Sequence, residues 1–324
     1  MASPLEVTKT ATLTGHRDCV YTLERSGQEN IFFSAAGDGF VVAWDLNNPE
    51  NGDLIANANS SVYALKYLAD KDLLVIGQNF KSLQVVSPGT KKLVHTVAMP
   101  PVSIFELAYS EMNQKLYAGL ADGSLVEIET DKTLSFSVKK VVKGNGKSLR
   151  CLALNEARNE LAAGYSDHSI KIFDAGTLKL KQEIEAHANS VFTVAYTPDG
   201  KYLLSGSRDA HLRVWNAEKN YEEHASIIAH MFTINHIAFS PDGKYFATCS
   251  MDKSIKVWDA ASFKLLKVID KARHAGHGTS VNKLFWSGHE NALVSCSDDR
   301  TISVWDIKLK RYEDNTVRNS AENV

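Results

Sequence analysis

Short hydrophobic runs alternate with tight turns along almost the whole chain, and no stretch shows the long period of a helix. Segments such as "SVFTVAY" and "HLRVWN" are rich in β-branched and aromatic residues, which favour strands. The turns "TPDGKY" at 197–202 and "SPDGKY" at 240–245 combine a proline that presets φ with a glycine that adopts a positive φ. The pattern therefore predicts an all-β protein of short antiparallel strands.

The strand pattern recurs in units that share four residue types at fixed spacing. In each of four segments a histidine precedes an aspartate by 22 positions, a serine or threonine precedes that aspartate by four, and a tryptophan follows it by six. The four sets are His16, Ser34, Asp38 and Trp44; His187, Ser205, Asp209 and Trp215; His230, Thr248, Asp252 and Trp258; and His277, Ser295, Asp299 and Trp305. This agreement indicates an internal structural repeat.

Three weaker units fit between the first two of these segments, because the 171 residues from Trp44 to Trp215 equal about four periods of roughly 43 residues. In the weaker units the aspartate position holds Phe80, Asp122 and Asp167, and the tryptophan position holds Val86, Ile128 and Phe173. In the last of these three units Asn145 stands at the histidine position. The seven motifs end near residues 45, 87, 129, 174, 216, 259 and 306. Four short strands fit into each unit, which predicts a seven-bladed β-propeller of four-stranded antiparallel sheets.

The Gly-His…Trp-Asp pattern resembles that of the WD40-repeat β-propeller family over about residues 5–311. The motif is clear in units 1, 5, 6 and 7, moderate in unit 4 and poor in units 2 and 3. The resemblance implies one propeller over residues 5–312, in which residues 5–13 pair with the last blade and remove an open sheet edge. Residues 313–324 are polar, and we predict that they are disordered.

Serine, histidine and aspartate in these units also match the residue types of a hydrolase triad. Such a site needs one nucleophile, one base and one orienting group in one cleft. Because the chain carries the set four times, each time with a tryptophan, a framework function is favoured over catalysis. We interpret each set as a buried hydrogen-bond chain that fixes the register of its blade, which is also what the family resemblance implies.

Composition narrows the function classes. The 324-residue chain has a net charge of -2 and 44% hydrophobic residues, which is ordinary for a soluble globular protein. We recognise no transmembrane segment, signal peptide or disulfide framework, and we predict a cytoplasmic, monomeric protein without a cofactor. His274 and His277 form a close pair that lacks cysteine or carboxylate ligands at metal-binding spacing, so no metal site is predicted.

The family resemblance also implies where partners bind. WD40-like propellers usually meet partners on the face that carries the loops between blades and the tight turns. Candidate positions there include the residue five places after the histidine and the residue one place before the aspartate. The candidate partner-binding residues are Tyr21, Tyr63, Phe105, Arg150, Phe192, Asn235 and Asn282, together with Arg208, Met251 and Asp298. Since aromatic residues and arginine dominate interface hot spots, we expect a non-catalytic scaffold that binds a protein or peptide.

Three alternatives stay open at this stage. The aromatic residues could instead pack against neighbouring blades around the mouth of the channel. An enzyme could use the central channel, which requires convergent ionisable groups with shifted pKa values. Nucleic acid could bind the basic stretch at 139–147, although the net charge disfavours it and a solvated strand edge explains the same residues. The residues of that stretch are Lys139, Lys140, Lys143 and Lys147.

Overall fold

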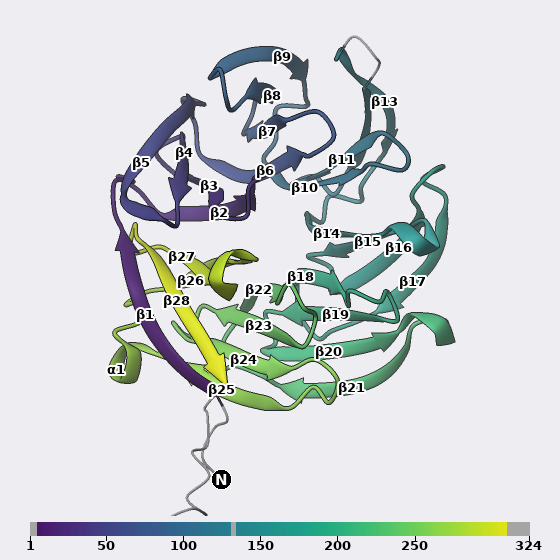
Figure 1. Cartoon of the computed structure of the whole chain (residues 1–324). Coiled ribbons are helices and arrows are strands. Elements are labelled where there is room, and N and C mark those ends of the chain that lie inside the picture. Colours follow the sequence, from purple (N-terminus) through teal and green to yellow (C-terminus); the bar gives the residue numbers. More distant parts are fainter. Residues whose placement is uncertain (1–4, 131–133, 310–324) are drawn as a thin grey trace, which may run out of the picture.

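The computed structural model describes residues 5–130 and 134–309, and these are almost entirely β. Seven four-stranded antiparallel sheets follow one another around a central channel, as Figure 1 shows. This arrangement confirms the predicted seven-bladed propeller. The predicted boundary at residue 312 and the predicted disordered tail at 313–324 lie outside the described residues.

Each blade runs from an inner strand at the channel to an outer strand at the perimeter. The inner strands of blades 1 to 7 are β2 (Val20–Arg25), β6 (Val62–Leu68), β10 (Ile104–Ser110), β14 (Leu149–Asn155), β18 (Val191–Tyr196), β22 (Ile234–Phe239) and β26 (Val281–Trp286). The second strands are β3 (Ile31–Ala36), β7 (Leu73–Gln78), β11 (Lys115–Leu120), β15 (Glu160–Tyr165), β19 (Tyr202–Ser207), β23 (Tyr245–Ser250) and β27 (Leu293–Ser297).

The third strands are β4 (Phe40–Asp45), β8 (Ser82–Ser87), β12 (Leu125–Thr130), β16 (Ser169–Asp174), β20 (His211–Asn216), β24 (Ile255–Asp259) and β28 (Ile302–Leu309). The outer strands are β5 (Asn48–Asn57), β9 (Lys92–Ala98), β13 (Phe136–Val142), β17 (Leu180–Glu185), β21 (Glu222–Ile228), β25 (Leu265–Ile269) and β1 (Leu5–Leu13). The described helices are single turns, namely α1 (Lys271–His274), η1 (Glu156–Arg158), η2 (Ala217–Lys219) and η3 (His289–Asn291).

The ring closes through the first described strand. β1 pairs antiparallel with β28, so that Leu5 lies opposite Leu309 and Leu13 lies opposite Ile302. In Figure 1 these two strands, purple and yellow, run side by side. The side chains of Leu5, Val7 and Leu13 are buried against blade 7 and its neighbours. This pairing confirms the predicted closure of the ring.

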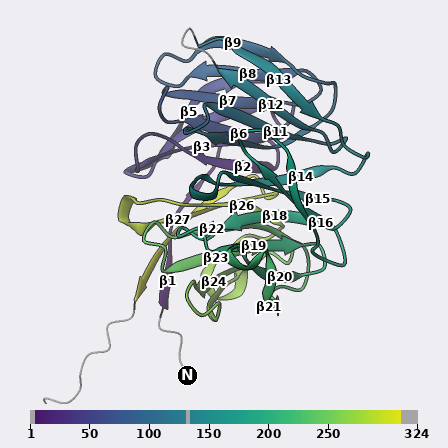
Figure 2. The same cartoon turned by 90° about the vertical axis from the view of Figure 1, so that its right-hand side faces the viewer.

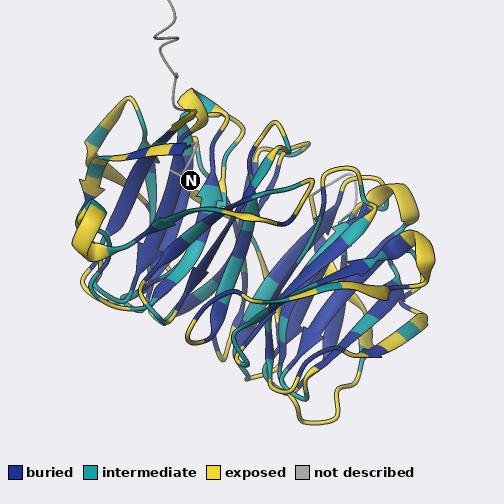
Figure 3. Cartoon of the chain, turned by 90° about the horizontal axis from the view of Figure 1, so that it is seen from below, coloured by how far each residue is buried: buried dark blue, intermediate teal, exposed yellow. Residues whose placement is uncertain are grey.

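The core lies between neighbouring blades. One cluster, for example, combines Val85 of blade 2 with Ile104 and Ile128 of blade 3. In Figure 3 the strands are largely buried and the loops exposed, and in the side view of Figure 2 the loops gather at the ends of the strands. We call the face with the loops between blades and the turns between second and third strands the top face, and the opposite face the bottom face.

Blades 2 and 3 are regular sheets although they lack the four-residue set. Val86 and Ile128 occupy the tryptophan position and are buried. Apolar side chains therefore fill the tryptophan position in these two blades. In blade 2 the buried amides of Gln78 and Asn79 also donate to the carbonyls of Ala58 and Ser61, so that side-chain hydrogen bonds still join the turn to the loop. Phe80, at the aspartate position of blade 2, is 63% exposed and has a φ of 64°, a left-handed conformation that is uncommon for a bulky residue.

Candidate functional site

The four repeated residue sets form the same hydrogen-bond chain inside four blades. In blade 5 the indole N–H of Trp215 donates to Ser205 Oγ at 2.8 Å, and this oxygen lies 2.8 Å from His187 Nε2. His187 Nδ1 lies 3.1 Å from Asp209 Oδ2. Since a carboxylate only accepts, His187 donates through Nδ1–H, and the serine hydroxyl donates to Nε2. The imidazole is thereby held as one neutral tautomer.

Blades 1, 6 and 7 repeat this geometry. The tryptophan Nε1 to hydroxyl distance is 2.8 Å for Trp44 and Ser34, 2.9 Å for Trp258 and Thr248, and 2.8 Å for Trp305 and Ser295. The histidine Nε2 to hydroxyl distance is 2.8 Å for His16, 2.8 Å for His230 and 2.9 Å for His277. The histidine Nδ1 to carboxylate distance is 3.2 Å for Asp38, 2.9 Å for Asp252 and 2.9 Å for Asp299.

In each hydrogen-bond chain the aspartate, histidine and serine or threonine are connected in the order of a hydrolase triad. The hydroxyl that would be the nucleophile is, however, inaccessible to a substrate. Ser205 is fully buried, and its oxygen already accepts the N–H of Trp215. A nucleophile must reach the carbonyl carbon of a substrate, which this oxygen cannot do without unfolding the blade. The burial therefore supports a framework function for the set.

Each aspartate also joins the loop between blades to the tight turn. Asp209 accepts hydrogen bonds from the backbone N–H of Ala188 at 2.9 Å and of His211 at 3.0 Å. Burial by itself raises the pKa of Asp209, but the hydrogen bonds from His187 and from these two N–H groups outweigh it and hold the pKa well below the usual range. Burial lowers the pKa of His187, which favours the neutral ring.

Replacing Asp209 with alanine is expected to destabilise the propeller by about 1–3 kcal/mol, because buried donors on His187 and Ala188 lose their acceptor. Asp167→Ala in blade 4 is the matched control, since its partner Asn145 is exposed and can bind water instead. We expect a smaller loss there. Thermal melting followed by circular dichroism measures both, and an unchanged melting temperature for Asp209→Ala would contradict the framework function.

On the top face, the seven residues five places after the histidine position converge on one concavity. Each is the second residue of its inner strand and is half-buried. These residues are Tyr21, Tyr63, Phe105, Arg150, Phe192, Asn235 and Asn282, and together with Glu106, His236 and Lys283 they line a cavity of about 370 Å³ at the mouth of the channel. The propeller thus gathers seven residues that are spread over more than 260 positions of sequence into one site.

Five of these side chains also contact one another across blade boundaries. The rings of Tyr21 and Tyr63 lie 4.8 Å apart between centroids, and those of Tyr63 and Phe105 lie 5.8 Å apart. The guanidinium of Arg150 lies 5.1 Å from the ring of Phe105 and 4.6 Å from that of Phe192, in cation–π geometry. The aromatic residues therefore do pack against neighbouring blades, and each keeps part of its surface exposed at the mouth.

The remaining candidates differ in how free they are. Asn235 Nδ2 donates to a backbone carbonyl of blade 7 at 2.8 Å, and Asn282 Nδ2 donates to Asp298 Oδ1 at 2.8 Å. Arg208 and Met251, by contrast, are exposed. Asn235, Asn282 and Asp298 thus stabilise the rim of the mouth through hydrogen bonds. Arg208 and Met251 face solvent.

Two exposed residues beside Met251 were missed by the sequence reasoning. Met231 and Phe232 lie on the loop before β22 and are 81% and 58% exposed. The available signal was the pair of bulky apolar residues directly after His230, where the other three histidine-containing loops carry charged, polar or small residues. This pair extends the apolar surface of the top face beyond the mouth.

Below the mouth an ion pair spans the channel. Lys283 Nζ of blade 7 lies 3.0 Å from Glu106 Oε2 of blade 3. Both residues also line a second cavity of about 320 Å³ deeper in the channel. The pair therefore separates the mouth from the lower channel.

The channel also brings together ionisable groups of the kind that an enzyme would need. Burial opposes the charge of Lys283, but Glu106 outweighs it and raises the pKa of the lysine. Burial raises the pKa of Cys151 and lowers the pKa of His236 well below its usual value. The paired ammonium and the protonated thiol are not activated nucleophiles, and Nδ1 of His236 already accepts the N–H of Leu284 at 3.3 Å.

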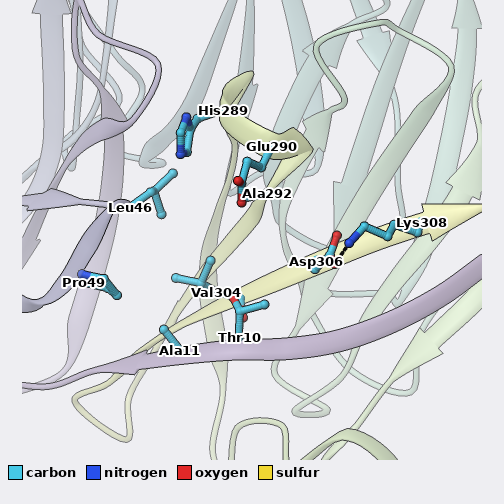
Figure 4. A pocket seen from close by; sticks show the side chains of 10 residues that line it. All are labelled: Thr10, Ala11, Leu46, Pro49, His289, Glu290, Ala292, Val304, Asp306 and Lys308. Atoms are coloured by element: carbon cyan, nitrogen blue, oxygen red, sulfur yellow. Dashed lines mark hydrogen bonds and ion pairs between the residues drawn. The ribbon is translucent and has the colours of Figure 1, made fainter.

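A further cavity lies on the bottom face where the ring closes. It has a volume of about 540 Å³, and Figure 4 shows its lining side chains, which come from β1, β28, the start of β5, η3 with Ala292 after it, and Leu46 between β4 and β5. The register of β1 shifts between Lys9 and Ala11, so that Thr10 is left out of the ladder beside this cavity. Asp306 and Lys308 at its rim pair with each other at 2.5 Å. The predicted partner-binding residues lie elsewhere.

The basic stretch at 139–147 already has partners for two of its lysines. Lys139 Nζ lies 3.4 Å from Glu129 Oε2, and Lys140 Nζ donates to the carbonyl of Thr177 at 2.6 Å. Within residues 5–130 and 134–309, no group of three or more histidine, cysteine, aspartate or glutamate side chains is placed to hold a metal ion. No helix in the same residues is long and apolar enough to cross a membrane.

Five segments of the chain match the model of one known protein family. The model described as "WD domain, G-beta repeat" matches residues 7–45, 136–174, 178–216, 222–259 and 268–306, which together make up more than half of the chain. The stretch from 46 to 135, which holds blade 2 and most of blade 3, is not matched. These are the two blades in which the repeated motif is poorest.

The chain is also similar to longer curated proteins. Striatin of Homo sapiens is 26% identical over 239 residues, which cover 67% of this chain and 30% of striatin. The striatin homolog of Dictyostelium discoideum is 23% identical over 248 residues, covering 65% and 29%, and Periodic tryptophan protein 2 of Arabidopsis thaliana is 23% identical over 203 residues, covering 62% and 22%. The chain spans less than a third of the length of these relatives. Through its repeat matches and its seven-bladed ring, the chain belongs to the WD40 repeat family.

Proposed function

We propose that this protein is a non-catalytic interaction scaffold that binds a protein or peptide segment over the channel mouth on its top face. The observation that carries the proposal is the convergence of seven predicted residues, four of them aromatic and one an arginine, on one open concavity. Aromatic and arginine side chains contribute most to interface hot spots. Their mutual packing holds them in place before a partner arrives, which lowers the ordering cost of binding.

Two observations disfavour the alternative of an enzyme. The serine or threonine oxygens of the four hydrogen-bond chains are buried and already accept an indole N–H. In the channel the ammonium of Lys283 is paired with Glu106, and burial raises the pKa of the Cys151 thiol, which keeps it protonated. Nucleic-acid binding through the lysines near 139–147 is disfavoured by the partners that Lys139 and Lys140 already have and by the net charge of -2. A monomeric state and a cytoplasmic location stay predictions.

Affinity capture from a lysate of the source cells, followed by quantitative mass spectrometry, tests the proposal. We expect wild-type protein to capture one or more proteins that the double variant Phe105→Ala/Arg150→Ala captures about tenfold less, since hot-spot side chains are removed. Met112→Ala is the matched control, because Met112 is exposed on the bottom face between β10 and β11. Equal capture by the wild type and the double variant would contradict the proposal.

A further inference from the structure

The top-face loop and turn of blade 6 carry apolar residues at positions where the other three blades with the complete four-residue set carry polar, charged or small residues. The two residues after the histidine are Met231 and Phe232 in blade 6. The corresponding residues are Arg17 and Asp18 in blade 1, Ala188 and Asn189 in blade 5, and Gly278 and Thr279 in blade 7. The residue before the aspartate repeats the contrast, since Met251 stands where blade 5 has an arginine and blade 7 an aspartate.

The three apolar side chains are held together by the framework beneath them. The N–H of Met231 donates to Asp252 Oδ2 at 3.0 Å, and the carbonyl of Phe232 accepts from Ser250 Oγ at 3.3 Å. The N–H of Met251 donates to the carbonyl of Thr233, in the same loop, at 3.0 Å. Loop and turn therefore form one unit, which we call the blade-6 tip and define by Met231, Phe232 and Met251.

The apolar side chains of the blade-6 tip are exposed, and exposed apolar side chains contribute no burial energy to the free protein. Met231 is 81%, Phe232 58% and Met251 57% exposed. A cluster of this kind marks an interaction site. The unbranched, polarisable methionine side chains adapt to apolar groups of different shapes, which suits a surface that accepts side chains from another chain.

Cationic side chains flank the blade-6 tip. The side chains of Arg208 and Lys253 are exposed, and within the described part of the chain neither side chain forms a hydrogen bond or an ion pair. The loop is fixed against the turn that carries Arg208, because the N–H groups of Ala229 and His230 donate to the carbonyl of Ala210 at 3.0 and 3.3 Å. One cation, Arg208, therefore lies on the turn next to the loop of Met231 and Phe232, and the other, Lys253, lies on the same turn as Met251.

The acidic groups near the blade-6 tip are already occupied. Asp252 accepts from His230 Nδ1 at 2.9 Å and from Ser254 Oγ at 2.6 Å, in addition to the loop N–H. Asp298, on the turn of the next blade, accepts from Asn282. Towards the mouth the positive charge continues, since burial lowers the pKa of Arg150 and the nearby Arg208 lowers it further. An anionic group bound here would relieve this repulsion.

We propose that the blade-6 tip recognises a short partner segment in which one or two bulky apolar side chains are flanked by acidic residues. The inference rests on the proposed scaffold function and adds the chemistry of the partner. The apolar side chains would pack on Met231, Phe232 and Met251, and a neighbouring carboxylate would bind the guanidinium of Arg208, whose fork suits a bidentate contact. The mouth residues next to the tip would bind the continuation of the same segment.

Selection of a phage library of random dodecapeptides on the immobilised full-length protein tests this inference. We expect enriched sequences with a bulky apolar residue next to aspartate or glutamate. A synthetic peptide from that set should bind Met231→Ser/Met251→Ser about tenfold more weakly in fluorescence anisotropy, as for lost hot-spot contacts. Arg208→Glu should weaken the acidic peptide by a similar factor, and Met112→Ser should leave its affinity within about twofold.

Several outcomes would overturn the inference. Enriched peptides that lack acidic residues, or that bind the tip variant as tightly as the wild type, would do so. Peptides that require Phe105 and Arg150 but not the tip would leave the scaffold function standing and remove only the inference. No enrichment at all would also remove the inference, while the lysate capture would still decide the scaffold function. Tip-dependent co-sedimentation with phosphatidylglycerol vesicles, without peptide binding, would assign the tip to a lipid surface instead.

Discussion

A chain that lacks residues 1–13 is expected to lose the stable propeller. Deletion removes β1 and with it the buried side chains of Leu5, Val7 and Leu13. Each such side chain contributes about 1.5–3 kcal/mol when buried, so the loss from the three is about 4.5–9 kcal/mol. That is comparable with the whole free energy of unfolding of a typical domain, roughly 5–15 kcal/mol. The same deletion leaves β28 as an open edge that can pair with other molecules.

Size-exclusion chromatography and thermal melting of the purified truncated chain measure this effect, and we expect aggregates and no cooperative transition. A circularly permuted chain provides the control. It starts at Thr14, runs to Leu309 and continues through an added Asn-Gly turn into residues 5–13, because Leu5 already lies opposite Leu309. We expect this control to melt close to the wild type. A truncated monomer as stable as the wild type would contradict the closing role of β1.

Breaking the ion pair in the channel is expected to be the next most severe change. Glu106→Ala leaves the ammonium of Lys283 without its carboxylate in a site where both side chains are only about 15% exposed. Removing one partner of such a pair costs about 3 kcal/mol, because the remaining charge is neither paired nor well hydrated. Urea denaturation followed by tryptophan fluorescence gives the free energy of unfolding of the variant and the wild type.

The double variant Glu106→Gln/Lys283→Met separates the charge effect from a packing effect. Replacing both charges removes the unpaired ammonium while keeping side chains of similar length, so we expect most of the lost stability to return. A double variant no more stable than Glu106→Ala would show that shape, rather than charge, determines the effect. The isolated Lys283→Met variant should be destabilised to a similar degree as Glu106→Ala, since it leaves an equally little exposed carboxylate without its partner.

The regular part of this molecule could be predicted from the sequence because it is local. A histidine and an aspartate 22 positions apart, with a tryptophan six further on, lie within one blade, and the spacing of Asp209 and Trp215 alone indicates the turn and the strand that follow. The positions at the mouth follow from the same register. The seven residues were therefore found even in blades 2 and 3, where Tyr63 and Phe105 are displayed without the hydrogen-bond chain.

The ion pair of Glu106 and Lys283 could not be predicted, because it depends on the closed ring. The two residues are 177 positions apart and meet only where inner strands from different parts of the ring face the same channel. The blade-6 tip was missed for a different reason. Met231 and Phe232 look like strand residues in the sequence, and the exposure of their side chains in the structure shows that they point outward.

The pairing of β1 with β28 also determines the order of events during synthesis. Among the described strands β1 is made first, and its partner at residues 302–309 is made last. Blades 1 to 6 can form as local units while the chain grows, but the ring stays open until residues 302–309 have been made. A ribosome that stops before Ile302 therefore releases a chain whose first strand has no partner. In that chain the backbone N–H and C=O groups of β1 are unpaired, and a quality-control factor that recognises exposed strands can bind them.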